Sequence, residues 1–423
     1  MSTSYEHAFY DALQKRMDET VFQQFAPQHG STGVTEDPIT GRQVLRNTAR
    51  SQRRFELKQE KPGADHPVIK VEDCHFCSGN TPSTLFYIGE SETVQGGKAE
   101  IAEEQLSLLS AKGAFGDSGI PLTGPGGRAA NIHDLGVYYE MLKRSKPLVF
   151  KDCKAKDWLW RSFFNLTPSF AKLPSNCILL AAHPEYHYLY LDQFPPSVVA
   201  SMIEGWKVWE GYVEWHNENN DGSALRVLPF VNGGKRPEAG QTMFCFHSQV
   251  YITPVPILFR QIQDFREQKG NVCPICTILN QNETTGTSLG KSGLEIYRNA
   301  TMSLCMHPAP LRNFAMIAMP YAQAGESEAG KKGGVCISRI NDLVNADVAD
   351  VLQRSIAIYR RLMGKVPAYN ISVRCGPEIV HLHIQIVPKT ETNILAGYED
   401  ITRQIVITQD PEETANTLRR RYA

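Results

Sequence analysis

The 423-residue sequence lacks the segments that would direct it into or across a membrane. No apolar run reaches the ~18 residues that a membrane-spanning helix needs, and the polar N-terminus has no signal-peptide hydrophobic core. An excess of one charge is also lacking, because 44 basic and 45 acidic residues leave a net charge of −1. Such a chain has no global field to recruit nucleic acid. We therefore expect a cytoplasmic protein that binds neither nucleic acid nor membranes.

A disulfide framework is not expected either, because ten cysteines are few for a chain of this length. Four of them stand in two Cys-x-x-Cys pairs, Cys74/Cys77 and Cys273/Cys276. That spacing lets two thiolates of one tight turn bind a single zinc ion. The cysteines thus favour metal binding over disulfide formation.

Two short stretches, at 381–388 (HLHIQIVP) and 245–252 (CFHSQVYI), combine histidine and glutamine in the same frame. In the first, polar and apolar residues alternate with the period of a half-buried strand, so the polar side chains share one face. A histidine-rich face that simply points to solvent is the alternative for a lone strand. The polar positions are His381, His383 and Gln385 in the first stretch and Cys245, His247 and Gln249 in the second.

Each of these stretches follows a Cys-x-x-Cys pair, so the chain contains two diverged copies of one unit. The separation is 173 residues from Cys74 to His247 and 110 residues from Cys273 to His383. The difference indicates an insertion in the first copy. Residues 95–135, which are rich in glycine and proline, are expected to form a long loop in that insertion, since no GKS or GKT sequence ends them as in a phosphate-binding loop.

Together these motifs resemble the histidine-triad (HIT) superfamily, and the two-copy arrangement resembles its galactose-1-phosphate uridylyltransferase branch. The segments "HIQIVPKTETNILAGYE" and "DPEETANTLRRR" are similar to the way those transferases end. The resemblance extends from about Asp37 to the end of the chain. It implies an α+β fold of two tandem HIT-like half-units, each an antiparallel sheet with packed helices, and a possible homodimer.

The expected domain organisation follows from this resemblance and from the local patterns. Residues 1–30 form an N-terminal helical extension, with an amphipathic helix at 5–25. Residues 31–258 form the N-terminal HIT-like half, and residues 259–423 form the C-terminal one. Further helices are expected at 196–216 and 346–364, where apolar residues recur at helical spacing.

The resemblance implies a nucleotidyltransferase that acts on a nucleotide-sugar through a covalent nucleotidyl-histidine intermediate. His247 is the expected nucleophile, and Gln249 would stabilise charge on the phosphoryl oxygens. His383 and Gln385 repeat the reactive pattern, so the second half is a rival site, and both halves could be active. At Gln385 the transferases usually carry a glutamate.

The same resemblance implies one or two metal sites. Cys74, Cys77 and Cys245 would bind zinc with a histidine of the turn "HPEYH", either His183 or His187, of which we favour His187. Cysteine replaces the usual histidine at position 245. A second site, for zinc or another transition metal, is expected from Cys273, Cys276, His307 and His381.

Residues matching substrate-binding positions of the transferases are arginines, which suit phosphate oxygens, and asparagines. The partners expected are a nucleotide-sugar or nucleotide and a sugar phosphate. Two alternatives stay open: a dinucleoside-polyphosphate or ADP-sugar phosphorylase or hydrolase, and a non-catalytic zinc- and nucleotide-binding protein. The substrate-binding candidates are Arg50, Arg53, Asn80, Arg161, Asn165, Asn232 and Arg312.

Overall fold

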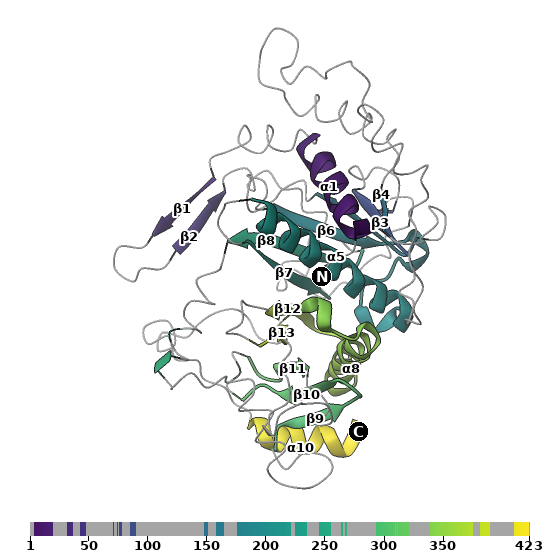
Figure 1. Cartoon of the computed structure of the whole chain (residues 1–423). Helices are drawn as coiled ribbons and strands as arrows, with labels where there is room; N and C mark the ends of the chain where they lie inside the picture. Colours follow the sequence, from purple (N-terminus) through teal and green to yellow (C-terminus); the bar gives the residue numbers. More distant parts are fainter. Residues whose placement is uncertain are drawn as a thin grey trace, which may run out of the picture. The chain divides into compact units, whose positions relative to one another are not determined.

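The computed structural model describes about half of the chain, including the helices and strands named below (Figure 1). The described residues are 4–19, 32–36, 43–47, 71, 74, 76–77, 85–89, 148–150, 158–164, 176–220, 225–234, 245–254, 264, 267–268, 293–308, 310, 312–320, 339–374, 381–389 and 410–422. The predicted loop at 95–135 lies outside them, as do Arg50, Arg53, Asn80, Asn165, Cys273 and Cys276.

The fold is α+β, with a large, mainly antiparallel sheet and helices packed on it, as the sequence predicts. The helices are α1 (Ser4–Glu19), α5 (Pro196–Asn219), α8 (Asn345–Met363) and α10 (Pro411–Tyr422), with 3-10 turns η3 (Pro184–Tyr186), η4 (Leu191–Gln193) and η5 (Ile340–Asp342). The strands are β1 (Thr32–Glu36), β2 (Gln43–Asn47), β3 (Phe86–Ile88), β4 (Leu148–Phe150), β5 (Trp160–Phe164), β6 (Asn176–Ala182), β7 (Leu225–Gly233), β8 (His247–Pro254), β9 (Glu295–Arg298), β10 (Met302–Met306), β11 (Met316–Pro320), β12 (Ala368–Arg374) and β13 (His383–Lys389).

The chain divides into two compact units. Unit 1 comprises residues 1–187, 211–225 and 249–254, and unit 2 comprises residues 188–210, 226–248 and 255–423. The predicted division into halves at residue 258 stays a prediction. None of the described helices is long and apolar enough to cross a membrane.

One order of elements occurs twice along the chain. Two neighbouring strands are followed by a long helix and then by two further strands, of which the last returns beside the second: β5, β6, α5, β7 and β8 in the first case, and β10, β11, α8, β12 and β13 in the second. The recurrence agrees with the interpretation of two diverged copies. In both cases the strand that carries His-x-Gln is the last one.

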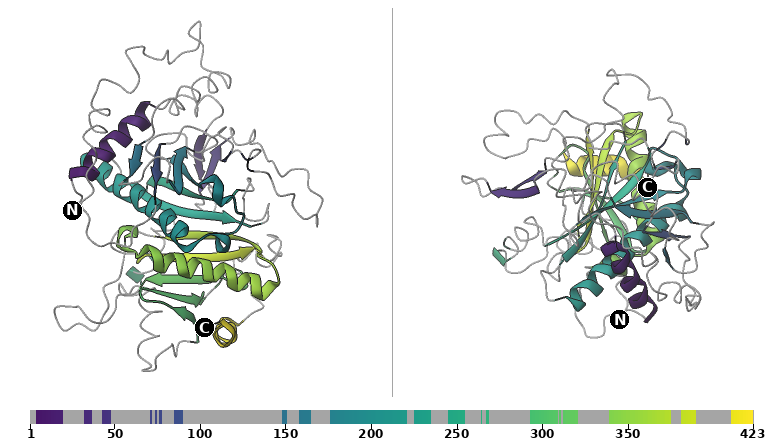
Figure 2. Two further views of the ribbon diagram at one scale, coloured as in Figure 1. Left: turned by 90° about the vertical axis from the view of Figure 1, so that its right-hand side faces the viewer. Right: turned by 90° about the horizontal axis from the view of Figure 1, so that it is seen from above.

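In unit 2 the strands run in the order β7-β12-β13-β11-β10-β9 and are all antiparallel. Helix α8 lies across these strands, and α10 covers the end of the sheet beside β9 (Figure 2). The buried residues of α8 include Val348, Leu352 and Ile356, which recur at the spacing of one helix face. Gly364, in the left-handed conformation with a φ of 70°, ends this helix. The predicted helix at 346–364 is confirmed.

In unit 1 the N-terminal helix α1 packs through its apolar stripe. Phe9, Leu13 and Met17 are 3%, 0% and 0% exposed, as expected from their spacing. Phe9 contacts the ring of Phe86 edge-on, with ring centroids 5.8 Å apart. The helix described ends at Glu19, within the predicted range 5–25. The N-terminal segment is therefore held by a buried apolar face.

Candidate functional site

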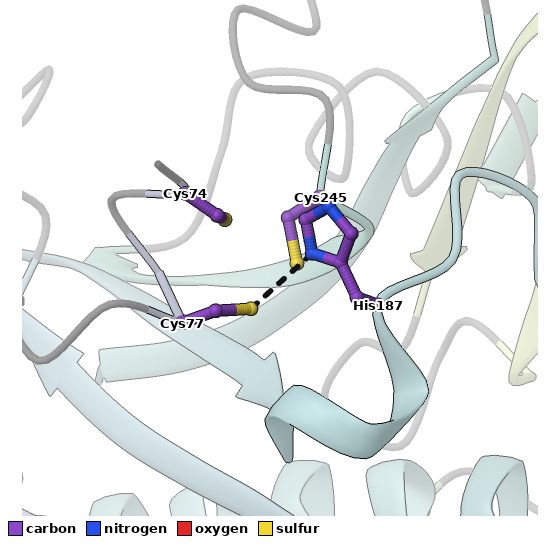
Figure 3. Close-up of side chains that lie close together, drawn as sticks. All are labelled: Cys74, Cys77, His187 and Cys245. Carbon is purple, nitrogen blue, oxygen red and sulfur yellow. Dashed lines mark hydrogen bonds between the residues drawn. The ribbon is translucent and has the colours of Figure 1, made fainter. Parts of the chain in front are cut away.

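Four side chains that the sequence singled out as metal ligands lie together (Figure 3). One potential donor atom from each of Cys74, Cys77, His187 and Cys245 lies within 4.8 Å of every other. The Sγ of Cys77 is 3.3 Å from Nδ1 of His187, which makes Nδ1 the nitrogen that faces the thiols. Among the described residues this is the only such group of histidine, cysteine and acidic side chains.

The two cysteines of the first pair are held by a tight turn. The N–H of Cys77 donates to the carbonyl of Cys74 at 3.0 Å, so both thiols emerge on one side of the turn. Arg161 of β5 donates a hydrogen bond to the carbonyl of Phe76, within this turn, and is only 8% exposed. The observed contact of Arg161 therefore orients the turn that carries Cys74 and Cys77. Its expected part in nucleotide binding stays a prediction.

The structure places His187 in the cluster and His183 outside it. His187 follows η3, where the chain turns back after the buried strand β6. His183 caps the other end of η3, with its Nδ1 accepting a hydrogen bond from the N–H of Glu185 at 3.3 Å. The imidazole of His183 also packs edge-on against Trp158 at 4.6 Å. The favoured choice of His187 thus agrees with the geometry.

Cys245 is brought to the cluster by the residues next to the ligands. The N–H of Phe246 donates to the carbonyl of Tyr188 at 2.8 Å. Since Tyr188 follows His187 and Phe246 follows Cys245, this bond ties the two ligands together through the main chain. The rings of Phe246 and Tyr188 both pack on Phe194, which buries the connection.

These four residues fit zinc. Three thiols and one imidazole form a Cys₃His set, and a donor separation of 3.3 Å suits a tetrahedron with bonds of about 2.0–2.3 Å. Hydrogen bonds with Cys74 and then Cys77 raise the pKa of His187 to about 10, so the thiol cluster attracts positive charge. Because the protein fills all four positions, the zinc would be structural, without the open position of a catalytic site.

His247, the predicted nucleophile, begins β8 directly beside this cluster. Its side chain is 3% exposed, and its Nδ1 is 3.0 Å from the carbonyl oxygen of Cys245. A carbonyl oxygen can only accept, so Nδ1 carries the proton and the lone pair is on Nε2. The carbonyl of Cys245, a member of the cluster, thus sets the tautomer of His247. Gln249, two residues along the strand, lies on the same face.

Ser248, which lies between His247 and Gln249, is anchored on the opposite face of β8. The indole N–H of Trp206 donates to Oγ of Ser248 at 2.9 Å, and this hydroxyl donates to the carbonyl of Phe230 at 3.2 Å. Trp206 is fully buried, as expected for a core residue. The chain of bonds fixes β8 at the position of His247.

We expect Trp206→Phe to lower the free energy of unfolding by about 1–3 kcal/mol, because it removes the buried donor and leaves a gap beside Ser248. Chemical denaturation of the two proteins measures this difference. Trp215→Phe is a comparison on the same helix, since its indole makes ring contacts with Tyr10 and Tyr212. A loss no larger for Trp206→Phe than for Trp215→Phe would contradict the anchoring role of Trp206.

The second His-x-Gln stands at the start of β13 and repeats this arrangement. Nδ1 of His383 is 3.1 Å from the carbonyl oxygen of His381, so Nδ1 again carries the proton and Nε2 the lone pair. His383 and Gln385 are 5% and 9% exposed. The alternative of a histidine-rich face pointing to solvent is therefore wrong for this strand.

His307 faces the second site. Its Nε2 lies 3.2 Å from the amide nitrogen of Gln385, which can donate to it. His307 follows β10 and bonds through its N–H to the carbonyl of Ala315, so it shares the face of Gln385. The proposed metal set with His381, Cys273 and Cys276 stays a prediction, because both cysteines lie outside the described residues.

Burial lowers the pKa of His383 from 6.5 to about 4, because desolvation disfavours the imidazolium; nearby Arg374 and His307 lower it further. The unfolded chain then binds more protons than the folded one between pH 4 and 6.5, so stability falls as the pH decreases through this window. We expect up to about 1 kcal/mol lost per pH unit. Denaturant unfolding at several pH values should show a flatter dependence for His383→Gln. Parallel curves would contradict a neutral, buried His383.

Contacts are described for two of the expected substrate-binding residues, Asn232 and Arg312, and their part in substrate binding stays a prediction. Nδ2 of Asn370 donates to Oδ1 of Asn232 at 2.7 Å, across the paired strands β12 and β7. Arg312 lies near Lys389, whose pKa it lowers after the larger effect of burial. Lys389 stands six residues along β13 from His383, or about 20 Å. The effect on Lys389 places Arg312 toward the far end of β13 from His383.

The architecture matches known structures. No protein-family model and no curated protein matches the sequence. The crystal structure of an ADP-glucose phosphorylase from Arabidopsis thaliana with bound ADP-glucose matches with a TM-score of 0.51 at 16% identity, covering 92% of this chain and 99% of that one. The chain has the fold of this phosphorylase. This match concerns the fold alone, and it agrees with the α+β class predicted from the sequence.

Two other solved structures match over smaller parts of the chain. A GALT-like protein from Arabidopsis thaliana has a TM-score of 0.47 at 19% identity, covering 62% of this chain and 84% of that one. A uridylyltransferase has a TM-score of 0.48 at 17% identity, with coverages of 62% and 86%. The ADP-glucose phosphorylase fold therefore covers more of the chain than either of these.

Proposed function

We propose that the protein is a nucleotidyltransferase that acts on a nucleotide-sugar, similar to a UDP-hexose:hexose-1-phosphate uridylyltransferase, with His247 as nucleophile. The observation that carries this proposal is the 3.0 Å contact between Nδ1 of His247 and the carbonyl oxygen of Cys245. The Nδ1 proton of His247 is committed to the carbonyl of Cys245, which directs the Nε2 lone pair to a substrate. Two tandem HIT-like half-units are part of the proposal, supported by the recurring order of strands and helix.

The reaction would proceed in two displacements. In the first, Nε2 of His247 forms a bond to the α-phosphorus while the bond from phosphorus to the sugar-phosphate oxygen breaks, and the leaving group takes the electron pair. In the second, a phosphate oxygen of the acceptor attacks the same phosphorus and restores the histidine. Gln249 donates to the phosphoryl oxygens as negative charge develops on them.

The metal cluster would support this chemistry without taking part in the reaction. Zinc held by Cys74, Cys77, His187 and Cys245 would supply structural rigidity. It would fix Cys245, and the Cys245 carbonyl then holds the ring of His247. The protein's own residues carry out the phosphoryl transfer.

A second candidate function is phosphorolysis of an ADP-sugar or a dinucleoside polyphosphate. It is supported by the match to the ADP-glucose phosphorylase, which covers 99% of that chain. The first displacement is the same, and inorganic phosphate then replaces the sugar phosphate as acceptor. Hydrolysis would use water at this step.

Intact-protein mass spectrometry tests both functions. We would incubate the protein with UDP-glucose, ADP-glucose, ATP or diadenosine tetraphosphate and measure the adduct mass. A uridylyl or adenylyl adduct identifies the donor, and its discharge by glucose 1-phosphate or by inorganic phosphate separates transferase from phosphorylase. No adduct with any donor, in protein that contains zinc, would contradict covalent transfer and favour a zinc- and nucleotide-binding protein.

A further inference from the structure

Arg374 stands directly opposite His383 in the sheet of unit 2. The two residues are partners in the antiparallel pairing of β12 and β13, so their side chains leave the same face with Cβ atoms about 5 Å apart. Gln385 is on this face as well, two residues along β13. An arginine, a histidine and a glutamine therefore converge on one patch of the sheet.

The charge of Arg374 is not balanced within the part of unit 2 that the structure describes. No ion pair or hydrogen bond from a described residue reaches its guanidinium, and burial is the only cause that lowers its pKa. Other arginines of this unit, Arg298, Arg354 and Arg360, each bond to a carboxylate at 2.7–2.9 Å. A half-buried cation without such a partner favours an anionic ligand.

The neighbouring groups specify which anion. Nε2 of His383 carries a lone pair, because Nδ1 donates its proton to His381. Such a nitrogen repels a fully ionised oxyanion and accepts a hydrogen bond from an acidic hydroxyl. The site therefore suits an anion that has both ionised oxygens and one protonated oxygen.

We propose that Arg374, His383 and Gln385 form a binding site for hydrogen phosphate. The guanidinium binds two ionised oxygens side by side, the P–OH donates to Nε2 of His383, and the second N–H of the Gln385 amide binds a remaining oxygen. Inorganic phosphate keeps a proton at neutral and mildly alkaline pH, whereas a phosphate monoester loses its last one near pH 6. Inorganic phosphate is therefore the expected ligand. This site does not depend on nucleotidyl transfer at His247.

Isothermal titration calorimetry of the full chain with inorganic phosphate and with sulfate tests the proposal. Sulfate has the same shape but no proton to donate at pH 7.5, so we expect phosphate to bind more tightly. His383→Ala should remove this preference. Arg374→Met should weaken phosphate binding by about tenfold or more, and Arg374→Lys by less, because a bidentate charged contact is lost or reduced. Glucose 1-phosphate should bind more weakly than phosphate.

Arg361→Met, which removes an exposed arginine of α8, is the matched control and should bind phosphate like the wild type. Glu378→Gln tests for an acidic competitor near Arg374 in sequence, and tighter phosphate binding in this variant would indicate one. Protection of Arg374 from phenylglyoxal by phosphate, mapped by peptide mass spectrometry, assigns the binding to this residue. Equal affinities in wild type and Arg374→Met, or no protection of Arg374, would overturn the proposal.

These results are independent of the outcome at His247. Phosphate binding is measured without a nucleotide donor, so it can succeed where no nucleotidyl adduct forms. Conversely, an adduct at His247 with no phosphate bound at Arg374 would leave the proposed function intact and contradict only the phosphate site.

Discussion

Replacing His247 by alanine is expected to lower the rate of nucleotidyl transfer by at least about 10⁴-fold, the scale on which enzymes respond to loss of a nucleophile. The variant should keep its metal content, because His247 is not among the four residues that could hold the metal. Steady-state turnover with the donor that forms the adduct, measured beside zinc content, gives the comparison.

The control for this result is His383, the histidine of the second His-x-Gln strand. His383→Ala removes an equally buried imidazole with the same bond from Nδ1 to a carbonyl two residues earlier. It should retain most of the transfer rate if His247 is the nucleophile. A large loss in His383→Ala with activity kept in His247→Ala would move the active site to the second half.

The second large effect is expected at the metal cluster. Cys77→Ser and Cys245→Ser should each reduce bound zinc from about one ion per chain to a small fraction and lower the stability by several kcal/mol, since binding of a structural zinc ion adds about 10 kcal/mol to folding in small domains. Zinc is measured by elemental mass spectrometry and stability by thermal unfolding with and without a chelator.

His183→Asn is the matched control for the cluster, because His183 lies four residues from His187 but outside the set of ligands. It should keep its zinc, whereas His187→Asn should lose it. Full zinc content in His187→Asn, or its loss in His183→Asn, would contradict the assignment of the fourth ligand.

The members of the cysteine–histidine cluster and the two His-x-Gln strands could be predicted from the sequence because each is a local pattern. Cys-x-x-Cys gives a turn, and His-x-Gln in an alternating segment gives two polar groups on one face of a strand. The choice between His183 and His187 was harder, since both belong to one short turn. The hydrogen bond between Phe246 and Tyr188 decides between the two histidines, because it brings Cys245 to His187. This bond joins residues far apart in the sequence.

Other features could not be found in this way because they depend on the register between strands. Arg374 ends one strand, and only its pairing with His383 shows that the two share a face. The anchor of Ser248 likewise requires Trp206 from the preceding helix. Arg161 is a candidate substrate-binding residue from the sequence resemblance, yet its contact with the carbonyl of Phe76 depends on how β5 packs beside the cysteine turn.

His247 and His383, the histidines of the two His-x-Gln strands, have the same tautomer. The positive charge near each of them differs. Beside His247 the cluster of Cys74, Cys77, His187 and Cys245 would hold zinc, whereas beside His383 the structure places Arg374. The difference suits two roles for the halves, covalent chemistry in one and anion binding in the other. The predicted substrate residues outside the described parts of the chain would complete the first.

The most direct test of the account is to locate the nucleotidyl group in the protein. After a brief incubation with the reactive donor, the protein would be quenched at alkaline pH, where a phosphorus–nitrogen bond to histidine survives, and digested for tandem mass spectrometry. We predict the modification on the peptide that contains His247, with fragment ions that assign it to that residue. Modification of His383 instead, or of neither histidine in zinc-loaded protein that turns over its substrate, would contradict the account.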